Sequence, residues 1–370
     1  MTHSKHLTFI AAARPNFMKI APLVRACMKS DSVSFTLIHT GQHYDKNMSD
    51  TFFEQLSIPQ PDLNLNIGGG SHATQTGNTM IAFESYLQEN KTDCVIVVGD
   101  VNATLACALT AKKQHIPVAH IESGLRSFDR SMPEEINRLA TDAISDFLYT
   151  PSPDADIQLK KEGVTDDKIC CIGNVMIDTL FNNLDAADQS NILNTINQSP
   201  GSYALLTLHR PSNVDDKATL EGILRGLEHV AKELPIVFPL HPRTKKQIES
   251  FGLEDAFNTH NKGTANFIVL EPVGYLEMLK LTKNANIILT DSGGLQEETT
   301  VLGVPCLTLR PNTERPITIT EGSNILVGTD TEAIITNFDK YKNTKSSRKP
   351  DLWDGHAADR FLSDILTRLD

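Results

Sequence analysis

Short apolar runs alternate with amphipathic stretches along almost the whole chain. The runs have the length and residue types of buried strands, and the stretches between them have the period of helices. Strands are predicted at residues 7–13, 33–40, 94–99, 118–122, 147–150 and 169–172, and again at 203–208, 236–240, 267–270, 287–290 and 306–309. Helices are predicted at 19–28, 104–114, 134–145, 220–234 and 294–302. This alternation predicts an α/β fold class with parallel sheets and right-handed crossovers.

A polar stretch at residues 182–202 divides this pattern into two halves, and we interpret it as a helix followed by a linker. The chain has 370 residues, enough for two domains that each bury a core. We therefore predict two Rossmann-like domains, at residues 1–180 and 200–345. A final helical pattern at 357–369 follows a second polar stretch, and segment 355–370 is predicted to join the first domain.

The composition narrows the class of protein. The net charge of −12 argues against nucleic acid and membrane surfaces as partners. Apolar runs stay well below the roughly 18 residues of a membrane span. The first apolar run breaks at Arg14-Pro15, so it is predicted to be a strand and not a signal peptide. Six cysteines without a C-x-x-C pair are typical of reduced thiols, which indicates a cytoplasmic protein.

Polar residues follow the predicted strands, where ligands bind in open parallel sheets. Arg14 and Lys19 flank the turn after the first strand. Two cations beside helix N–H groups suit a diphosphate, and a salt-bridging loop is the plainer alternative. The chain contains no G-x-G-x-x-G motif, so a tightly bound nicotinamide dinucleotide is not expected.

Three acids follow later strands of the first half. Asp100 ends one strand, Glu122 ends the next, and Glu134 follows Pro133 at the start of a helix. A helix cap explains Asp100 and the helix dipole explains Glu134 when each is taken alone. Arg138 is four residues after Glu134 and is expected on the same helix face. Three converging carboxylates raise each other's pKa, as a general acid or base near neutral pH requires.

The second half carries a matching set of cations and a phosphate-binding turn. His209 and Arg210 end its first strand, and His241 ends the next. Ser292 with Gly293 and Gly294 opens a helix, where backbone N–H groups can approach a phosphate. Glu298 lies further along that helix and Arg315 follows the next strand. We predict that a nucleotide diphosphate binds here and that its sugar faces the acids. A single histidine is more often structural, and a plain turn is the alternative at Ser292.

The ordered motifs resemble those of the non-hydrolysing bacterial and archaeal UDP-N-acetylglucosamine 2-epimerases, from about residue 7 to residue 330. They are Arg14-Pro15 with Lys19, Thr40-Gly41-Gln42-His43, Val98-Gly99-Asp100, Ile121-Glu122-Ser123-Gly124-Leu125-Arg126, Pro133-Glu134-Glu135-Ile136-Asn137-Arg138, Gly173-Asn174, His209-Arg210 and Asp291-Ser292-Gly293-Gly294-Leu295-Gln296-Glu297-Glu298. The resemblance implies a glycosyltransferase-B-like fold with its active site in the interdomain cleft. It also implies interconversion of UDP-GlcNAc and UDP-ManNAc without NAD or metal, through elimination of UDP to 2-acetamidoglucal and its re-addition.

The same resemblance implies roles for individual residues. The catalytic set is Asp100, Glu122, Glu134 and His209; the substrate-binding set is Arg14, Lys19, Arg138, Arg210, Val273, Met278, Ser292, Gly293, Gly294, Glu298 and Arg315. Glu298 is expected to hold the ribose, and Val273 and Met278 to border the uracil. Gln42, His43 and His241 match a second, regulatory UDP-GlcNAc site. The family is usually homodimeric and supplies nucleotide sugars to polysaccharide biosynthesis.

The chain departs from the family pattern in four places. Ala12-Ala13 replaces a frequent Gly-Thr, Pro211-Ser212 replaces a frequent Arg-Glu, Tyr44-Asp45 follows Gln42-His43 in place of Arg-Glu, and the loop Gly68-Gly69-Gly70-Ser71-His72 lacks an arginine. These departures put regulation in doubt more than chemistry. Four alternatives stay open: an epimerase of a diacetamido-uronate, a hydrolysing epimerase, a glycosyltransferase of the same fold, and a UDP-sugar sensor without activity.

Overall fold

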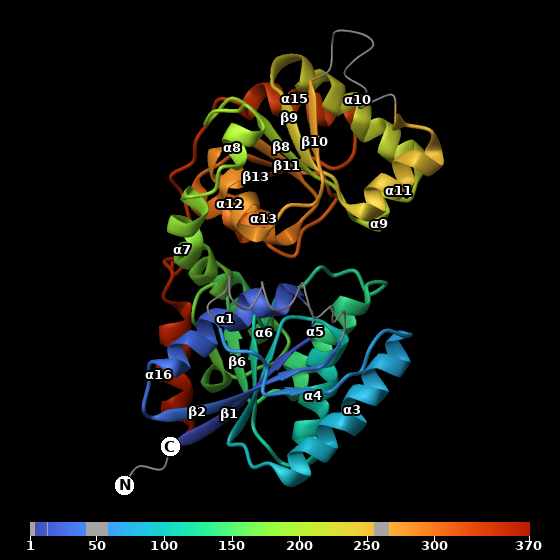
Figure 1. The fold of residues 1–370 in the computed structure, drawn as a ribbon. Helices are drawn as coiled ribbons and strands as arrows, with labels where there is room; N and C mark the ends of the chain where they lie inside the picture. Colours follow the sequence, from blue (N-terminus) through green and yellow to red (C-terminus); the bar gives the residue numbers. More distant parts are fainter. Residues whose placement is uncertain (1–3, 13, 42–57, 255–265) are drawn as a thin grey trace. The chain divides into compact units, whose positions relative to one another are not determined.

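A computed structural model of the chain describes residues 4–12, 14–41, 58–254 and 266–370, except for the side chains of Arg14 and Pro15. The chain divides into two compact units, each with its own parallel sheet (Figure 1). Unit 1 comprises Met1–Phe181 and Asp351–Asp370, and unit 2 comprises Asn182–Pro350.

Unit 1 contains a seven-stranded sheet in the order β3-β2-β1-β4-β5-β6-β7. Its strands are β1 (Lys5–Ala11), β2 (Val33–His39), β3 (Leu63–Asn64), β4 (Cys94–Val98), β5 (Val118–Ile121), β6 (Phe147–Thr150) and β7 (Ile169–Cys171). Its helices are α1 (Arg14–Met28), α3 (His72–Glu89), α4 (Asn102–Lys113), α5 (Pro133–Ile144), α6 (Pro153–Lys161), the 3-10 helix η1 (Asp166–Lys168) and α16 (Ala357–Leu369). Helix α7 (Val175–Asp188) begins in unit 1 and ends in unit 2.

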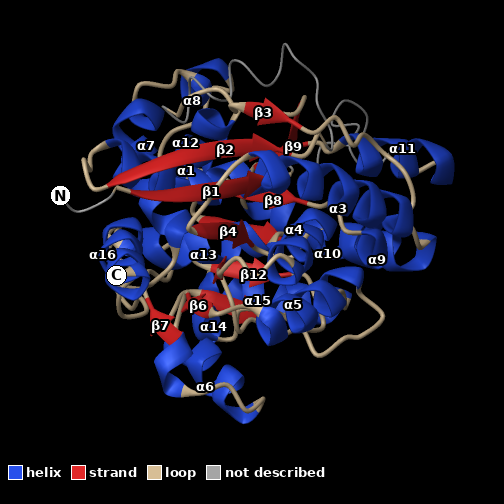
Figure 2. Ribbon diagram, turned by 90° about the horizontal axis from the view of Figure 1, so that it is seen from below, coloured by secondary structure: helices blue, strands red, loops and turns tan. Residues whose placement is uncertain are grey.

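Helices cover both faces of this sheet (Figure 2). On one face, Phe83 of α3 and Cys107 of α4 pack with Ile10 and Val95 of the strands. The neighbouring strand residue Phe9 points to the other face, where its ring meets the ring of Phe361 on α16. Successive side chains of a strand alternate between faces, and strands buried on both faces are therefore apolar throughout.

Unit 2 contains a six-stranded sheet in the order β10-β9-β8-β11-β12-β13. Its strands are β8 (Ala204–Thr207), β9 (Ile236–Pro239), β10 (Phe267–Leu270), β11 (Ile287–Thr290), β12 (Cys306–Thr308) and β13 (Asn324–Leu326). Its helices are α8 (Ile192–Thr195), α9 (Pro211–Val214), α10 (Lys217–Glu233), α11 (Pro242–Phe251), α12 (Tyr275–Asn284), α13 (Gly293–Leu302), α14 (Ile317–Thr320) and α15 (Thr331–Tyr341). Alternation again supplies two cores, since Leu206 joins one cluster and Leu205 the other.

The strand order fixes where each unit can hold a ligand. In unit 1 the order reverses between β1 and β4, and in unit 2 it reverses between β8 and β11. The loops that follow such a pair of strands leave in opposite directions and open a crevice at the carboxyl ends. Asp100 follows β4, and His209 and Asp291 follow β8 and β11. The topology therefore brings these polar residues to the switch points.

The strands expected from the apolar runs are all present. Three have the predicted bounds (Phe147–Thr150, Phe267–Leu270 and Ile287–Thr290), and the others shift or shorten by one or two residues at an end. Helix α3 was missing from the predicted set because its first two turns are polar and its buried stripe is only Thr79, Phe83 and Leu87. Strands β3 and β13 were missing because they are very short edge strands.

The last segment of the chain packs into unit 1. Asp178 of α7 is buried and accepts hydrogen bonds from the first backbone N–H groups of α16, those of Ala357 and Ala358, at 3.1 and 2.8 Å. Burial raises the pKa of Asp178 to about 6. Trp353, four residues before α16, is buried. Its indole N–H donates to the carbonyl oxygen of Pro151 at 2.9 Å. These contacts hold α16, at the C-terminal end of the chain, in the same unit as the N-terminal strand β1.

The six cysteines are free thiols, four of them buried and two, Cys170 and Cys171, half-buried. Burial raises the pKa of Cys27 and Cys306 to about 12, so these thiols stay protonated near neutral pH. In the part of the chain that the structure describes, no helix combines the length and the apolar character needed to cross a membrane.

We expect Gly173→Ala to destabilise unit 1 far more than Gly163→Ala. Both glycines have left-handed backbones, with φ of 86° and 91°, so each alanine costs about 1 kcal/mol of conformational strain. Only at Gly173 would the new Cβ lie 2.2 Å from a backbone oxygen, that of Leu352; around Gly163 the space is open. The Gly163 variant should lose about 2–4 °C of Tm and the Gly173 variant at least about twice that.

The single tryptophan, Trp353, lies in unit 1, so the melting transition of this unit can be followed by intrinsic fluorescence. Equal losses of Tm in the two variants would contradict the close approach of Leu352 to Gly173.

Candidate functional site

The acids of unit 1 stand on two neighbouring turns at the carboxyl edge of the sheet. Strands β4 and β5 are paired with Val98 opposite Ile121, and the N–H of Gly99 donates to the carbonyl of Ile121 at 3.1 Å. Gly99 and Glu122 both have left-handed backbones, with φ of 69° and 68°. For a glutamate this conformation is unfavourable and is typical of a functional position.

Lys19 of α1 lies against Glu122. Its ammonium group donates to the Glu122 carboxylate, and the two side chains are 14% and 8% exposed. A Cβ added to Gly99 would lie 3.2 Å from the Lys19 nitrogen, so the lysine also crosses the turn before Asp100. Lys19 therefore belongs to the acid site. Arg14 begins α1, but its side chain lies outside the described part of the structure.

Asp100 is joined to helix α5 through Arg138. One guanidinium nitrogen is 2.6 Å from Asp100 and another is 2.6 Å from Glu135. Glu135 is buried and also accepts from the backbone N–H groups of Ser127 and Phe128 at 2.9 Å. Burial alone would raise the pKa of Glu135, but these N–H groups and Arg138 hold it below its usual value.

On the helix, Arg138 pairs with Glu135, three residues before the arginine. Glu134 is half-buried in the first turn of α5, one turn before Asn137, whose amide donates to the carbonyl of Asp100 at 2.9 Å. The structure therefore brings Asp100, Glu122 and Glu134 to the same edge of the sheet. The carboxylate groups of Glu122 and Asp100 face the cations of Lys19 and Arg138.

In unit 2 the buried carboxylate of Asp291 organises the switch point. It accepts from the backbone N–H groups of His209 and Arg210 at 2.9 and 2.8 Å, and the Nδ1 atom of His209 lies 2.8 Å away. Burial alone would raise the pKa of Asp291, but His209 and these hydrogen bonds lower it. With Nδ1 facing Asp291, the opposite ring nitrogen of His209 points away from the carboxylate, and the imidazole is 41% exposed.

The turn Ser292-Gly293-Gly294 opens helix α13. Ser292 is the N-cap, and a Cβ at Gly293 would lie 2.9 Å from a guanidinium nitrogen of Arg315, whereas the space around Gly294 is open. Arg315 is held in turn by Glu297, at 2.5 Å. A helix N-terminus with an arginine across it and room at the second glycine has the charge and the space that an anion such as phosphate requires.

Buried carboxylates set the direction of two more guanidinium groups. Arg210 donates to the carbonyl of Asp291 at 3.1 Å and lies 3.7 Å from Glu314, which forms a two-point ion pair with Arg310 at 2.7 and 2.9 Å. Burial would raise the pKa of Glu314, but Arg310, Arg315 and Arg210 hold it far below its usual range. Three guanidinium groups, those of Arg210, Arg310 and Arg315, therefore gather around Glu314.

Glu298 is buried on α13 and accepts a hydrogen bond from the hydroxyl of Tyr275 at 3.2 Å. Burial, together with the neighbouring Glu297, raises the pKa of Glu298 to about 7, against the effect of Tyr275. Val273 and Met278 are half-buried and pack against one of the cores of unit 2.

His241 caps helix α11, and its ring lies 5.5 Å from the ring of His209, centroid to centroid. Burial and the proximity of His209 lower the pKa of His241. The other residues expected at a regulatory site, Gln42 and His43, lie outside the described residues. The structure therefore places His241 beside the candidate phosphate site and leaves the rest of that prediction untested.

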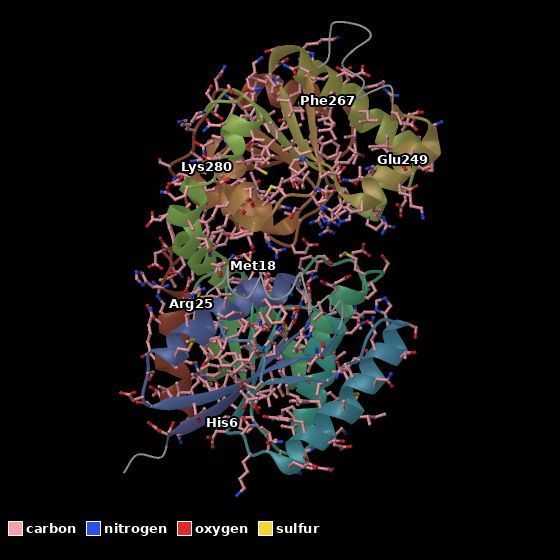
Figure 3. The ribbon with its side chains drawn as sticks, in the orientation of Figure 1. His6, Met18, Arg25, Glu249, Phe267 and Lys280 are labelled. Atoms are coloured by element: carbon pink, nitrogen blue, oxygen red, sulfur yellow. The ribbon has the colours of Figure 1, made fainter. Side chains whose placement is uncertain are left out.

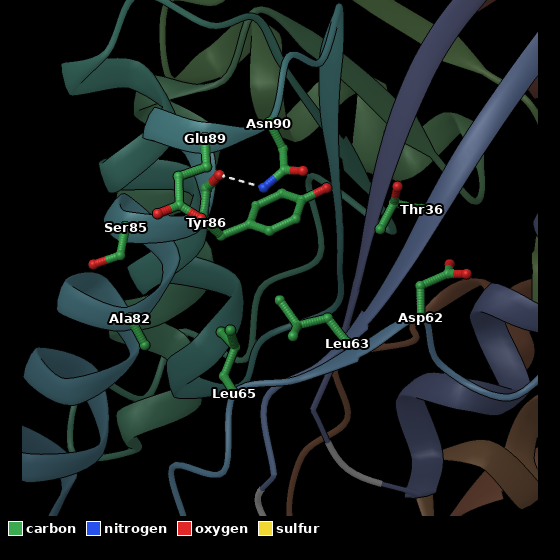
Figure 4. A pocket seen from close by; sticks show the side chains of 9 residues that line it. All are labelled: Thr36, Asp62, Leu63, Leu65, Ala82, Ser85, Tyr86, Glu89 and Asn90. Carbon is green, nitrogen blue, oxygen red and sulfur yellow. Dashed lines mark hydrogen bonds between the residues drawn. The ribbon is translucent and has the colours of Figure 1, made fainter.

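Two further features lie apart from these residues. A pocket of about 480 Å³ opens between α3 and the sheet edge, lined by Thr36, Asp62, Leu63, Leu65, Ala82, Ser85, Tyr86, Glu89 and Asn90 (Figure 4). On α10 and α15, the group His229, Glu233 and Asp339 has a geometry that could hold a metal ion, but the Lys342 ammonium already contacts both carboxylates. Neither feature shares a residue with the acid or phosphate sites.

Sequence reasoning missed the residues that hold the site residues in place, among them Glu135, Glu297, Tyr275 and Arg310. Glu135 had a signal, because residues three apart on a helix also share a face. Tyr275 and Arg310 had none, since they reach the site from elements that are distant in the sequence.

Comparisons with known proteins agree with this geometry. The family model of UDP-N-acetylglucosamine 2-epimerase matches residues 25–366. The UDP-N-acetylglucosamine 2-epimerase of Methanocaldococcus jannaschii is 45% identical over 366 residues, which cover 98% of this chain and 98% of that protein. The UDP-2,3-diacetamido-2,3-dideoxy-D-glucuronate 2-epimerase of Pseudomonas aeruginosa is 40% identical over 369 residues, 99% of this chain and all of that protein.

Solved structures give the same result for the fold. The crystal structure of the M. jannaschii enzyme in complex with UDP-GlcNAc and UDP matches with a TM-score of 0.87 and 45% identity, over 98% of this chain and 99% of that one. A glycosyltransferase matches with a TM-score of 0.59 at 11% identity, over 99% of each chain, which concerns the fold alone. The predicted glycosyltransferase-B-like class, with two Rossmann-like units, is confirmed, and the chain belongs to the UDP-N-acetylglucosamine 2-epimerase family.

Proposed function

We propose that the protein interconverts UDP-N-acetylglucosamine and UDP-N-acetylmannosamine by inverting C2 of the sugar. The observation that carries the proposal is the match to 2-epimerases along nearly the whole chain, combined with a carboxylate pair at adjoining strand ends. The reaction needs cations that accept a leaving diphosphate and carboxylates that move the C2 proton. Unit 2 supplies the first set of groups and unit 1 supplies the second.

The diphosphate binds at the N-terminus of α13 in this proposal. The N–H groups of Gly293 and Gly294, with Arg315 across them and Arg210 beside Asp291, stabilise the negative charge that grows on UDP as the bond to C1 breaks. His209, oriented by Asp291, lies at the same switch point and is the group placed to protonate or hydrogen-bond a phosphate oxygen. Glu298 accepts hydrogen bonds from the ribose, and Val273 and Met278 border the base.

The acids remove and return the C2 proton. Elimination takes a proton from one face of C2 and re-addition delivers one to the other face, so two groups are needed, and Asp100, Glu122 and Glu134 are the candidates. Lys19 beside Glu122 and Arg138 beside Asp100 hold these carboxylates in place and balance their charge. UDP adds back to C1 of the 2-acetamidoglucal, so the sequence consumes no cofactor.

A second candidate substrate has support of its own. The relative from P. aeruginosa acts on a UDP-diacetamido-glucuronate and is 40% identical over the whole chain, close to the 45% of the M. jannaschii enzyme. Identity at this level does not separate the two sugars, so both must be assayed. The dimer and the second UDP-GlcNAc site with Gln42, His43 and His241 remain part of the proposal for this family member, as does a role in polysaccharide biosynthesis.

The direct test is incubation of the protein with UDP-GlcNAc in deuterated water. We expect deuterium at C2 of the sugar and formation of UDP-ManNAc, followed by NMR, without net release of UDP. Net release of UDP in step with free sugar would indicate a hydrolysing epimerase, and release that requires an acceptor would indicate a glycosyltransferase. Exchange with the diacetamido-uronate alone would reassign the substrate, and no exchange with either would leave only the sensor.

Asp100→Asn should abolish C2 exchange, with a loss of at least about 100-fold in rate, because the amide cannot take up the proton. UDP affinity should change by less than about twofold, since the diphosphate is assigned to unit 2. The matched control is Asp146→Asn, which breaks another aspartate–cation pair of unit 1, with Lys112 at 2.7 Å, at the amino end of β6. Near-normal exchange in the Asp100 variant would remove Asp100 from the reaction.

Glu298→Gln should remove a pH dependence from nucleotide binding. The pKa of Glu298 is about 7, and only the ionised form accepts hydrogen bonds from two hydroxyls, so its contribution to affinity is small below pH 6 and grows as the pH rises to 8. Calorimetry with UDP and 2′-deoxy-UDP isolates this effect, because the phosphate titration cancels in the ratio of the two affinities.

The wild-type preference for UDP over 2′-deoxy-UDP should increase between pH 6 and pH 8, and UDP affinity at pH 8 should fall about tenfold in Glu298→Gln. The preference should be independent of pH in the variant. An increase of the same size in both proteins would mean that Glu298 does not hold the ribose.

A further inference from the structure

His120 is buried in β5, two residues before Glu122, and both of its ring nitrogens have close partners. The Nδ1 atom lies 2.6 Å from a carboxylate oxygen of Asp142 on α5. The Nε2 atom lies 2.8 Å from the carbonyl oxygen of Gly99, the residue before Asp100. His120 therefore connects the end of β5, which leads to Glu122, with the turn that carries Asp100.

The partners determine the protonation state of the ring. A backbone carbonyl oxygen only accepts hydrogen bonds, and an ionised carboxylate only accepts them as well. Asp142 also accepts from the N–H of Gly124 at 3.0 Å and lies 2.7 Å from Arg126. Burial would raise the pKa of Asp142, but His120 and Arg126 lower it, so it is ionised. Both nitrogens of His120 must then donate, which makes the ring an imidazolium.

This pair of side chains holds both acid-bearing turns. His120 binds the carbonyl of Gly99 on one side, and Asp142 binds the N–H of Gly124 on the other. Gly99, Glu122 and Gly124 all have left-handed backbones, with φ of 69°, 68° and 81°. Three such residues in two adjacent turns need fixed partners, because a glutamate in this conformation relaxes when its surroundings allow it.

The charges around the pair nearly cancel. Arg126 is held by Asp142 and by Glu162 at the end of α6, while Lys19 faces Glu122 and Arg138 faces Asp100 and Glu135. The imidazolium is therefore balanced by a carboxylate at 2.6 Å and adds no net charge to the site.

We propose that His120, as an imidazolium paired with Asp142, is a positioning residue that fixes Asp100 and Glu122 in the geometry for proton transfer at C2. The step that it serves rests on the proposed function, whereas the protonation state and the two hydrogen bonds do not. The inference thus divides into a structural part and a kinetic part that are tested separately.

The structural part is tested in the wild-type protein by ¹⁵N NMR of labelled histidines, with His120 assigned from the variant that lacks it. His6 on β1 is the internal control (Figure 3), because its nitrogens face the hydroxyls of Ser34 and Thr36 at 2.9 and 3.0 Å, which accept or donate and so permit a neutral ring. At neutral pH, His120 should carry a proton on both ring nitrogens, one in the hydrogen bond to Asp142 and one in that to Gly99, whereas the hydroxyl partners of His6 do not require this. A ring nitrogen of His120 without a proton would overturn the proposal.

The kinetic part uses two variants that each keep one hydrogen bond. In His120→Asn the amide nitrogen lies near the place of Nδ1 and can reach Asp142, and in His120→Gln it can reach the carbonyl of Gly99. Each should lower kcat for C2 exchange by about 10- to 100-fold, as small misplacements of reacting groups do. UDP affinity should stay within about twofold, and His6→Asn should behave as wild type.

Wild-type kcat in both variants would overturn the positioning role. Loss of kcat and UDP binding in the same proportion would also overturn it, because that result indicates a purely structural histidine. Absence of exchange in the wild-type protein would instead defeat the proposed function, and the NMR result would still decide the state of His120.

Discussion

Buried carboxylates that accept backbone N–H groups hold the functional turns of this protein. Asp291 binds the N–H groups of His209 and Arg210, and Asp142 binds that of Gly124. Removing such a carboxylate from water is unfavourable by several kcal/mol unless hydrogen bonds and cations replace the water. Each of these carboxylates has both kinds of partner, and the result is that a loop at the sheet edge acquires one conformation.

Buried charged side chains orient different groups in the two units. In unit 2 the buried acids direct cations: Glu314 and Glu297 orient Arg310 and Arg315, and Arg315 then lies over Gly293 at the start of α13. In unit 1 the buried groups direct acids, because Arg138 and Lys19 lie against Asp100 and Glu122. In a chain with a net charge of −12, three guanidinium groups thus gather at one turn of unit 2. The net charge alone therefore does not exclude an anionic ligand.

The sequence predicts the strands well because the central ones are buried on both faces, which leaves an apolar run such as Cys94–Val98 between polar turns. It predicts which residues stand at strand ends, including Asp100, Glu122, His209 and the Ser292 turn, because parallel strands bring their carboxyl ends to one edge. The sequence does not predict which side chains form ion pairs or hydrogen bonds with these residues. The pairing of Arg138 with Glu135, of Tyr275 with Glu298 and of His120 with Gly99 depends on how helices pack, and no period in the sequence encodes that.

Pro211 shows how one departure from the family pattern is accommodated. The family pattern has a frequent arginine at this position. Proline removes both the guanidinium group and the backbone N–H of residue 211. In the structure Pro211 occupies the first turn of the short helix α9, after Arg210 as N-cap, where a missing N–H leaves no hydrogen bond unmade. Asp291 draws its donors from residues 209 and 210, so the carboxylate loses nothing. The fixed φ of proline stiffens the turn that carries His209 and Arg210, and Arg310 beside Glu314 keeps a third guanidinium next to Arg210 and Arg315. The substitution thus removes one cation and restricts the backbone of the turn that follows His209 and Arg210.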